Sequence, residues 1–223
     1  RVPLPELIEL DSDFGWLIGI FLAEGSLNNS KITFSFHAKE VDTLGQKTCD
    51  ILFRRFGIWA TKVVRNNRCD VKLYGANWCQ LLNELCLNGS FKKRLHPLLA
   101  SGNKEFLEGV LNGWQDGDGL GDPQRCGGVT VSHELAMNMY DIANAIGHRP
   151  TIETLQVKIN PKHNIKRRRL RYIVAWPKNR KPQISERSDQ DDTHVWRKVA
   201  KLETEQIAWQ RRRLDYSRVS LVI

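Results

Sequence analysis

Two segments of this sequence share one pattern of small residues. They are GWLIGIFLAEG, from Gly15 to Gly25, and GVLNGWQDGDG, from Gly109 to Gly119. Each has small residues at its first, fifth and ninth positions, then a carboxylate, then a glycine. Because a glycine inside a helix costs about 1 kcal/mol relative to alanine, this spacing indicates a contact where two helix backbones approach closely. The repeated element predicts a molecule with pseudo-twofold symmetry.

The same packing would place the acids that end the two segments, Glu24 and Asp118, side by side. Two neighbouring carboxylates repel each other, and a divalent cation with a preference for oxygen ligands relieves the repulsion. The alternative is two ordinary buried helices, each ended by a glycine with an acid at a solvated end. The agreement between the two copies favours the close pair.

The runs LIGIFLAEG (Leu17 to Gly25) and LNGWQDGDG (Leu111 to Gly119) resemble the two signature motifs of the LAGLIDADG homing endonucleases, in their single-chain, two-motif branch. The resemblance covers about Asp11 to Trp176. It implies an α+β fold: a pseudo-twofold duplicated αββαββα arrangement with two antiparallel sheets forming a DNA-binding saddle. The departures from the motif do not fall on the acids; they are Phe21, Leu22, Trp114 and Gln115.

The resemblance also divides the chain. Residues 1–100 are expected to form the first half-domain, residues 101–177 the second, and residues 178–223 a linker and an extension whose role stays open. The segments VPLPELIEL and HVWRKVAKLE are similar to the flanks of endonuclease domains embedded in inteins. The sequence has no N-terminal cysteine or serine nucleophile and no terminal His-Asn pair, so splicing is not expected.

The function implied by the resemblance is that of a site-specific homing endonuclease. It would make a double-strand cut in a long asymmetric duplex by metal-dependent phosphodiester hydrolysis. Glu24 and Asp118 are the expected catalytic residues and Mg²⁺ ligands, aided by the backbone carbonyls of Ala23 and Gly117. Mn²⁺ is expected to substitute for Mg²⁺, and Ca²⁺ to bind without supporting cleavage.

A basic residue near the acids is also implied by the resemblance, and it falls in the segment SFKKRLHPLL, from Ser90 to Leu99. We assign it to Lys93, with Lys92 and Arg94 as close alternatives. The other interpretation of this segment is a charge cluster that flanks a helix.

Strict alternation from Lys31 to His37 predicts a half-buried strand with one polar face, which either contacts DNA or is merely solvated. Three arginines share one face of a later strand, where they could contact phosphates and guanine edges. The predicted DNA-contacting residues are Lys31, Thr33, Ser35, His37, Arg65, Arg68, Lys72, Lys158, Arg167, Arg169 and Arg171.

The remaining periodicities predict further elements. Helices are expected at Glu40 to Phe56, Asn77 to Leu87 and His133 to Ile146. Strands are expected at Ile58 to Val64, Cys69 to Tyr74, Gly127 to Ser132, Thr151 to Ile159 and Lys166 to Trp176. Asp11 or Ser12 is the expected N-cap of the first motif helix.

Composition agrees with a nucleic-acid partner. The 223 residues carry a formal net charge of +9, which favours a polyanion, here double-stranded DNA. No membrane-length apolar span or signal peptide is found, and five cysteines without CxxC pairs favour a reducing, intracellular compartment. We expect a monomer.

Two alternative functions remain. The first is an RNA maturase or a non-cleaving sequence-specific DNA-binding protein on the same fold, and the second is a structural domain whose charge serves only solubility.

Overall fold

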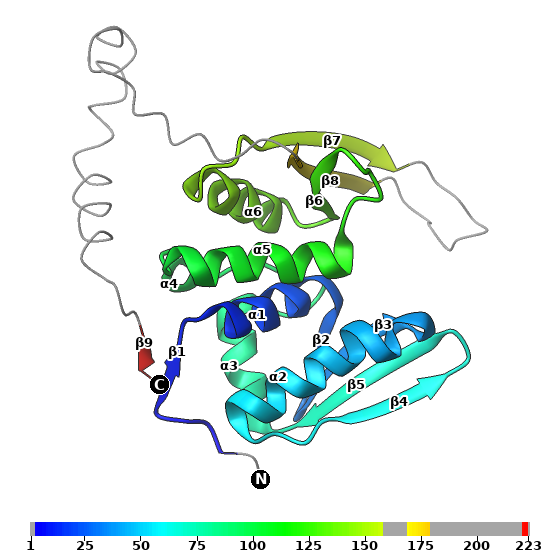
Figure 1. Cartoon of the computed structure of the whole chain (residues 1–223), viewed down its shortest axis with the longest axis vertical. Coiled ribbons are helices and arrows are strands. Elements are labelled where there is room, and N and C mark those ends of the chain that lie inside the picture. Colours follow the sequence, from blue (N-terminus) through cyan, green and yellow to red (C-terminus); the bar gives the residue numbers. More distant parts are fainter. Residues whose placement is uncertain (1–2, 158–168, 179–219, 223) are drawn as a thin grey trace, which may run out of the picture.

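Two helices that run side by side in the same direction form the centre of the molecule (Figure 1). They are α1 (Ser12–Glu24) and α5 (Lys104–Asp118). The computed structural model describes residues 3–157, 169–178 and 220–222. The Asp11 carboxylate accepts a hydrogen bond from the Phe14 amide at 2.9 Å, which confirms Asp11 as the N-cap of α1. Asn103 caps α5 in the same way, with 2.8 Å to the Phe106 amide.

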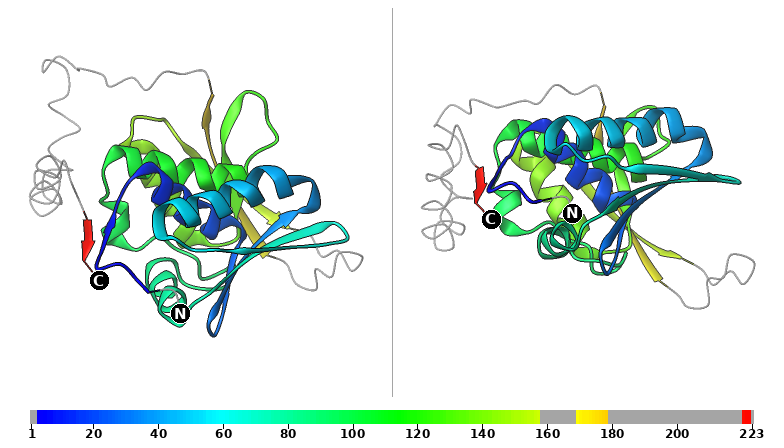
Figure 2. Two further views of the ribbon diagram at one scale, coloured as in Figure 1. Left: turned by 60° about the horizontal axis from the view of Figure 1, so that its bottom comes forward. Right: turned by 90° about the horizontal axis from the view of Figure 1, so that it is seen from below.

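An antiparallel sheet lies on each side of this helix pair (Figures 1 and 2). The first has the order β2-β3-β5-β4, from β2 (Gly25–Asn28), β3 (Lys31–His37), β4 (Thr61–Arg65) and β5 (Arg68–Tyr74). The second has the order β6-β8-β7, from β6 (Arg125–Thr130), β7 (Thr151–Val157) and β8 (Arg169–Pro177). This mixed architecture of helices and two antiparallel sheets confirms the predicted fold class.

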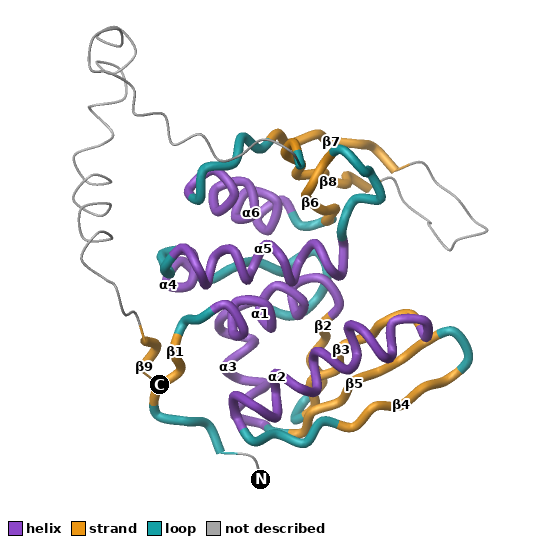
Figure 3. Tube along the Cα trace, in the orientation of Figure 1, coloured by secondary structure: helices purple, strands orange, loops and turns teal. Residues whose placement is uncertain are grey.

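Further helices flank the central pair and the two sheets (Figure 3). Their bounds are η1 (Ala38–Glu40), η2 (Val41–Gly45), α2 (Gln46–Phe56), α3 (Ala76–Cys86), α4 (Pro97–Ala100) and α6 (His133–Ala145). The single helix predicted from Glu40 to Phe56 is therefore divided, since η2 is a π-helical turn. It ends as expected at Gly57, whose φ of 63° is a left-handed conformation that favours glycine.

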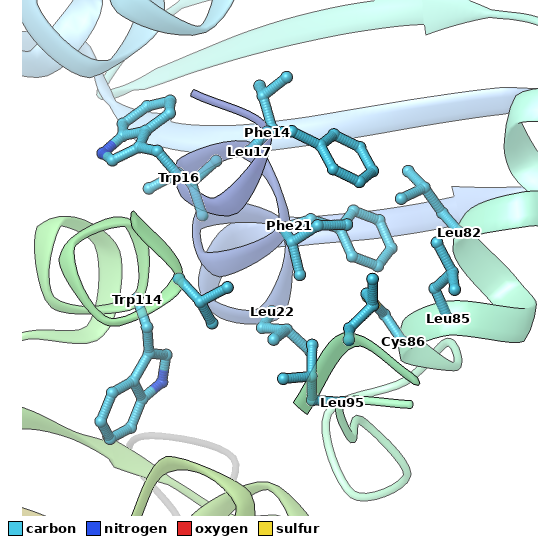
Figure 4. Packing of buried hydrophobic residues seen from close by; sticks show 14 of the residues in the cluster. Phe14, Trp16, Leu17, Phe21, Leu22, Leu82, Leu85, Cys86, Leu95 and Trp114 are labelled. Atoms are coloured by element: carbon cyan, nitrogen blue, oxygen red, sulfur yellow. The ribbon is translucent and has the colours of Figure 1, made fainter. Parts of the chain in front are cut away.

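The core surrounds α1 (Figure 4). Phe14, Leu17 and Phe21 are buried on this helix. The side chains of Ile32, Phe34 and Phe36, which share one face of β3, are buried as the alternation predicted. The polar face of β3 therefore points away from the helices.

A third, two-stranded sheet joins distant parts of the sequence. β1 (Leu7–Glu9) pairs antiparallel with β9 (Ser220–Val222), with Ile8 opposite Leu221. Two predicted DNA contacts, Lys158 and Arg167, lie outside the described residues, as does most of the predicted extension.

Within the described residues, no helix is both long and apolar enough to span a membrane. The five cysteines are free thiols, and Cys79 and Cys86 are buried in α3.

Candidate active site

The glycines of the two motifs set the distance between α1 and α5. A Cβ added to Gly19 would lie 2.1 Å from the Val110 carbonyl oxygen, and one on Gly113 would lie 2.2 Å from the Trp16 carbonyl oxygen. Because the obstructing atoms are backbone, no rotamer change could make room. The helix contact predicted from the repeated pattern is confirmed.

The close contact continues to the C-terminal ends of the helices. A Cβ on Gly117 would lie 2.5 Å from the Ala23 Cβ and 3.1 Å from the Glu24 Cγ. Glu24 is the last residue of α1 and Asp118 the last residue of α5. The fold thus brings the two predicted acids to neighbouring helix ends.

Both acids have raised pKa values. Burial raises the pKa of Glu24 to about 7, and the negative charge of Asp118 adds to the effect. Burial also raises the pKa of Asp118, although the Lys93 ammonium opposes this. Two partly buried carboxylates, one of which raises the pKa of the other, form an environment in which a bound cation would stabilise the ionised forms.

Lys93 also lies beside these helix ends. Its side chain is only 5% exposed, and its Nζ donates hydrogen bonds to the carbonyls of Phe21 at 2.9 Å and Ala23 at 3.2 Å. Burial lowers its pKa to about 8, against the charges of Asp118 and Glu24. Of the three basic candidates, Lys92 is exposed and Arg94 lies 3.8 Å from Glu134, so Lys93 is the one that the fold directs to the helix ends.

A cavity of about 480 Å³ opens beside these groups. Lys93 and Asp118 line it together with Ser90, Thr130 and Arg171. Arg171 was predicted from its strand face, but the pattern did not indicate that it lines the same cavity as Asp118 and Lys93. The neighbouring Arg169 begins β8.

The oxygen donors at this place suit a hard divalent cation. Glu24 and Asp118 bring two carboxylates to the helix ends, where the last carbonyls of a helix, such as those of Ala23 and Gly117, lack intrahelical partners. Mg²⁺ prefers such oxygen ligands and keeps several waters. The described residues contain no cluster of three or more His, Cys, Asp or Glu side chains, so water or phosphate oxygens would complete the shell. The Ala23 carbonyl already accepts from Lys93, and its second lone pair is left for a cation.

The predicted contacts on the first sheet differ in exposure. Antiparallel register places Thr33 opposite Lys72, Ser35 opposite Asp70, and His37 opposite Arg68 on the polar face. Thr33 is only 7% exposed and leaves little surface for a ligand. His37 is exposed, but its Nδ1 accepts from the Lys39 amide. The other two predicted contacts are Lys31, which is half-buried, and Arg65, which is exposed at the end of β4.

Sequence reasoning missed two acids with clear roles in the structure. Asp70 joins the side chains of Ser35, Arg68 and Lys72 on the polar face. Asp116 accepts from the Trp16 indole Nε1 at 2.7 Å and from the Lys47 Nζ at 3.2 Å, which links α5, α1 and α2. The alternation that places Asp70 on the polar face was visible in the sequence, but nothing in the sequence identified the partners that leave its side chain only 16% exposed.

The raised pKa of Glu24 makes the stability of the protein depend on pH. In EDTA, where no metal competes, the Glu24 carboxyl holds its proton in the folded state but loses it in the unfolded state at pH values between its usual pKa of 4.5 and its folded pKa of about 7. We therefore expect the free energy of unfolding to fall as the pH rises through this window, with Asp118 acting in the same direction. Lys93 acts in a separate window, from about 8 to 10.5, where stability rises with pH.

Urea unfolding of the wild type and of Glu24→Gln between pH 4 and pH 8 checks this prediction. In Glu24→Gln, the free energy of unfolding should fall much less over this pH range than in the wild type. An unchanged slope in Glu24→Gln would show that other groups cause it.

No protein-family model matches the chain. DNA-directed RNA polymerase subunit Rpo1C of Methanocaldococcus jannaschii is 31% identical over 120 residues, 52% of this chain and 13% of that protein. ATP-dependent DNA helicase Hel308 of Thermococcus kodakarensis is 30% identical over 159 residues, 66% of this chain and 14% of that protein. An iron-sulfur cluster assembly SufBD family protein of Mycobacterium tuberculosis is 26% identical over 162 residues, 68% of this chain and 19% of that protein. The chain spans less than a fifth of the length of each.

Solved structures of the homing endonuclease I-DmoI are similar in fold. Its mesophilic variants align with a TM-score of 0.54 at 9% identity, over 75% of this chain and 89% of that chain. I-DmoI in complex with DNA and Mn aligns with a TM-score of 0.52 at 10% identity, over 75% of this chain and 90% of that chain. I-DmoI in complex with DNA and Ca gives 0.54 at 10% identity, over 75% of this chain and 83% of that chain. The chain therefore has the LAGLIDADG homing endonuclease fold, which its two glycine-rich motifs predicted.

Proposed function

We propose that this protein is a site-specific DNA endonuclease that cuts both strands of a duplex by divalent-metal-dependent phosphodiester hydrolysis. The observation that carries the proposal is the convergence of Glu24, Asp118 and Lys93 at two helix ends held together by glycines. The similarity in fold to I-DmoI, whose solved complexes contain DNA with Mn or Ca, supports it.

Glu24 and Asp118 would hold the cation through their carboxylates. Mg²⁺ bound there would supply Lewis-acid stabilisation of charge on phosphate oxygens and an activated water. Each acid would serve one strand, so one glutamate and one aspartate permit unequal cutting rates on the two strands. The Lys93 ammonium, held by the Phe21 and Ala23 carbonyls, would place a positive charge beside the phosphate that is cut.

The outer faces of the two sheets would bind the duplex. Exposed basic side chains such as Arg65, Arg68 and Arg171 would contact phosphates or base edges. Phosphate contacts release counterions, so binding should weaken steeply as salt rises.

We further infer that the domain belongs to a mobile element carried inside host proteins. The three curated relatives have names that describe unrelated activities, and each matches over a small share of its length. A domain inserted into different hosts would give this pattern.

Selection of cut sites from a randomised duplex library tests the proposed function. With Mg²⁺ we expect products cut at one long, asymmetric sequence, and with Ca²⁺ we expect binding to the same sequence without cutting. Sequence-specific binding without cutting in Mg²⁺ or Mn²⁺ would favour a non-cleaving DNA-binding protein, and preferential binding of structured RNA a maturase. Failure to bind any duplex even at low salt would contradict the proposal.

Lys93→Met is expected to lower the cleavage rate about 100-fold, because it removes a positive charge from the helix ends while keeping the buried volume. Lys92→Met is the matched control, since it removes the same charge from an exposed neighbour. Single-turnover cleavage of the selected duplex measures both. Equal rates for the two variants would rule out the role given to Lys93.

A further inference from the structure

Four polar side chains form one connected group on the outer face of the first sheet. The Asp70 carboxylate accepts from the Ser35 hydroxyl at 3.1 Å and from the Arg68 Nε at 2.5 Å, both through Oδ1. The Arg68 Nη2 donates to the Ser35 Oγ at 2.8 Å, which closes a triangle between β3 and β5. The Lys72 Nζ lies 3.7 Å from Asp70 Oδ2.

An acid at this position is unfavourable for simple phosphate binding. Burial alone would raise the pKa of Asp70, but hydrogen bonds from Arg68 and Ser35, with the charges of Arg68 and Lys72, outweigh it and lower the pKa. Asp70 is therefore ionised at neutral pH and offsets part of the positive charge around it. A surface that served only to attract phosphates would be better without this carboxylate.

The geometry of Arg68 indicates what the acid does instead. Asp70 and Ser35 hold the Nε and Nη2 atoms, which form one side of the planar guanidinium group. In the part of the chain that the structure describes, Nη1 makes no hydrogen bond, and the side chain is 61% exposed. The end of the guanidinium group that carries Nη1 and the second Nη2 hydrogen is thus left for a ligand.

Paired donors at the end of an arginine match the O6 and N7 acceptors of guanine in the major groove. A guanidinium group already fixed by protein contacts loses less rotational freedom on binding, and its orientation discriminates between base pairs more strongly. Lys72 has no comparable orientation, because a single ion pair at 3.7 Å joins it to Asp70.

We propose that Arg68 reads one guanine of the DNA target through its free end, and that Asp70 and Ser35 are positioning residues that hold it for this contact. The inference rests on the proposed function and adds to it a base and the residues that select it. The guanine should stand at one fixed distance from the cut, on the half of the target that the first sheet contacts.

Sequence selection by binding in Ca²⁺ tests this inference, with wild type, Arg68→Ala, Asp70→Ala and Asp70→Asn compared on the same randomised library. The wild type should require guanine at one position, and Arg68→Ala should lose about tenfold or more of the preference there and at no other position. Asp70→Ala should lose most of the same preference and bind unrelated duplexes more tightly, since a negative charge is removed.

The asparagine variant separates positioning from charge. Asp70→Asn also removes the charge, so its affinity for unrelated duplexes should rise as in Asp70→Ala, but its amide oxygen can still accept from Arg68 and should retain much of the guanine preference. Lys72→Ala is the control for a positive charge on the same face, and it should weaken binding without changing preference at any single position. Thermal unfolding of each variant confirms that it is folded.

An unchanged guanine preference in Arg68→Ala would overturn the reading role. Equal preference in Asp70→Ala and Asp70→Asn would overturn the positioning role. A wild type that binds no duplex would contradict the proposed function itself, so the two failures are distinguishable.

Discussion

Replacing Gly113 by alanine is expected to destabilise the protein by about 3 kcal/mol, even though alanine is the better helix former by about 1 kcal/mol. The added Cβ would lie 2.2 Å from the Trp16 carbonyl oxygen and 2.8 Å from the Ile20 amide nitrogen, so α1 and α5 must separate. For a chain of 223 residues the melting temperature should fall on the order of 10 °C.

Gly121→Ala is the control, because no atom lies within 4 Å of the position its Cβ would take. Calorimetry of both variants should show a loss only for Gly113→Ala. Cleavage should also fall in Gly113→Ala, since separation of the helices moves Glu24 away from Asp118. A melting temperature within about 2 °C of the wild type would mean that the helices are less tightly joined than the structure indicates.

Removing either acid is expected to abolish double-strand cleavage while leaving binding intact. Glu24→Gln and Asp118→Asn keep the size of each side chain but remove the charge that would hold the cation. We expect a loss of about 1000-fold or more in the single-turnover rate of double-strand cleavage, equivalent to about 4 kcal/mol in the activation barrier. Affinity for the selected duplex in Ca²⁺-free buffer should be equal to that of the wild type or higher, because a charge facing phosphates is lost.

Glu108→Gln controls for the loss of an acid from the same helix. Glu108 is exposed near the other end of α5, where it lies 3.6 Å from Lys104. This variant should cut at the wild-type rate. Cleavage by either active-site variant at a similar rate would remove that acid from the mechanism.

The centre of the fold was predictable because the close approach of α1 and α5 requires glycine at particular positions, and those glycines can be seen in the sequence. Glycines at a spacing of four, in both motifs, have one good explanation, and the structure places Gly19 and Gly113 at backbone contacts. The strand at Lys31–His37 and the helix stop at Gly57 were equally predictable from alternation and from the left-handed preference of glycine.

Other features depend on contacts between distant segments and leave no local signal. The four-residue strand β2 is too short for a periodicity, and the pairing of β1 with β9 joins opposite ends of the sequence. The segment that contains Lys93 has three basic residues in a row, and only the fold determines which one is buried. The link from Asp70 to Ser35 likewise required the register of β3 and β5.

Calcium binding to the protein–duplex complex tests the central claim most directly, because Glu24 and Asp118 would hold the divalent cations that cleavage requires. Titration calorimetry of the wild-type complex should show saturable Ca²⁺ binding that the duplex alone lacks. The double variant Glu24→Gln, Asp118→Asn should bind the duplex but bind Ca²⁺ at least about tenfold more weakly. Equal Ca²⁺ binding by the two complexes would contradict a metal site formed by the ends of α1 and α5.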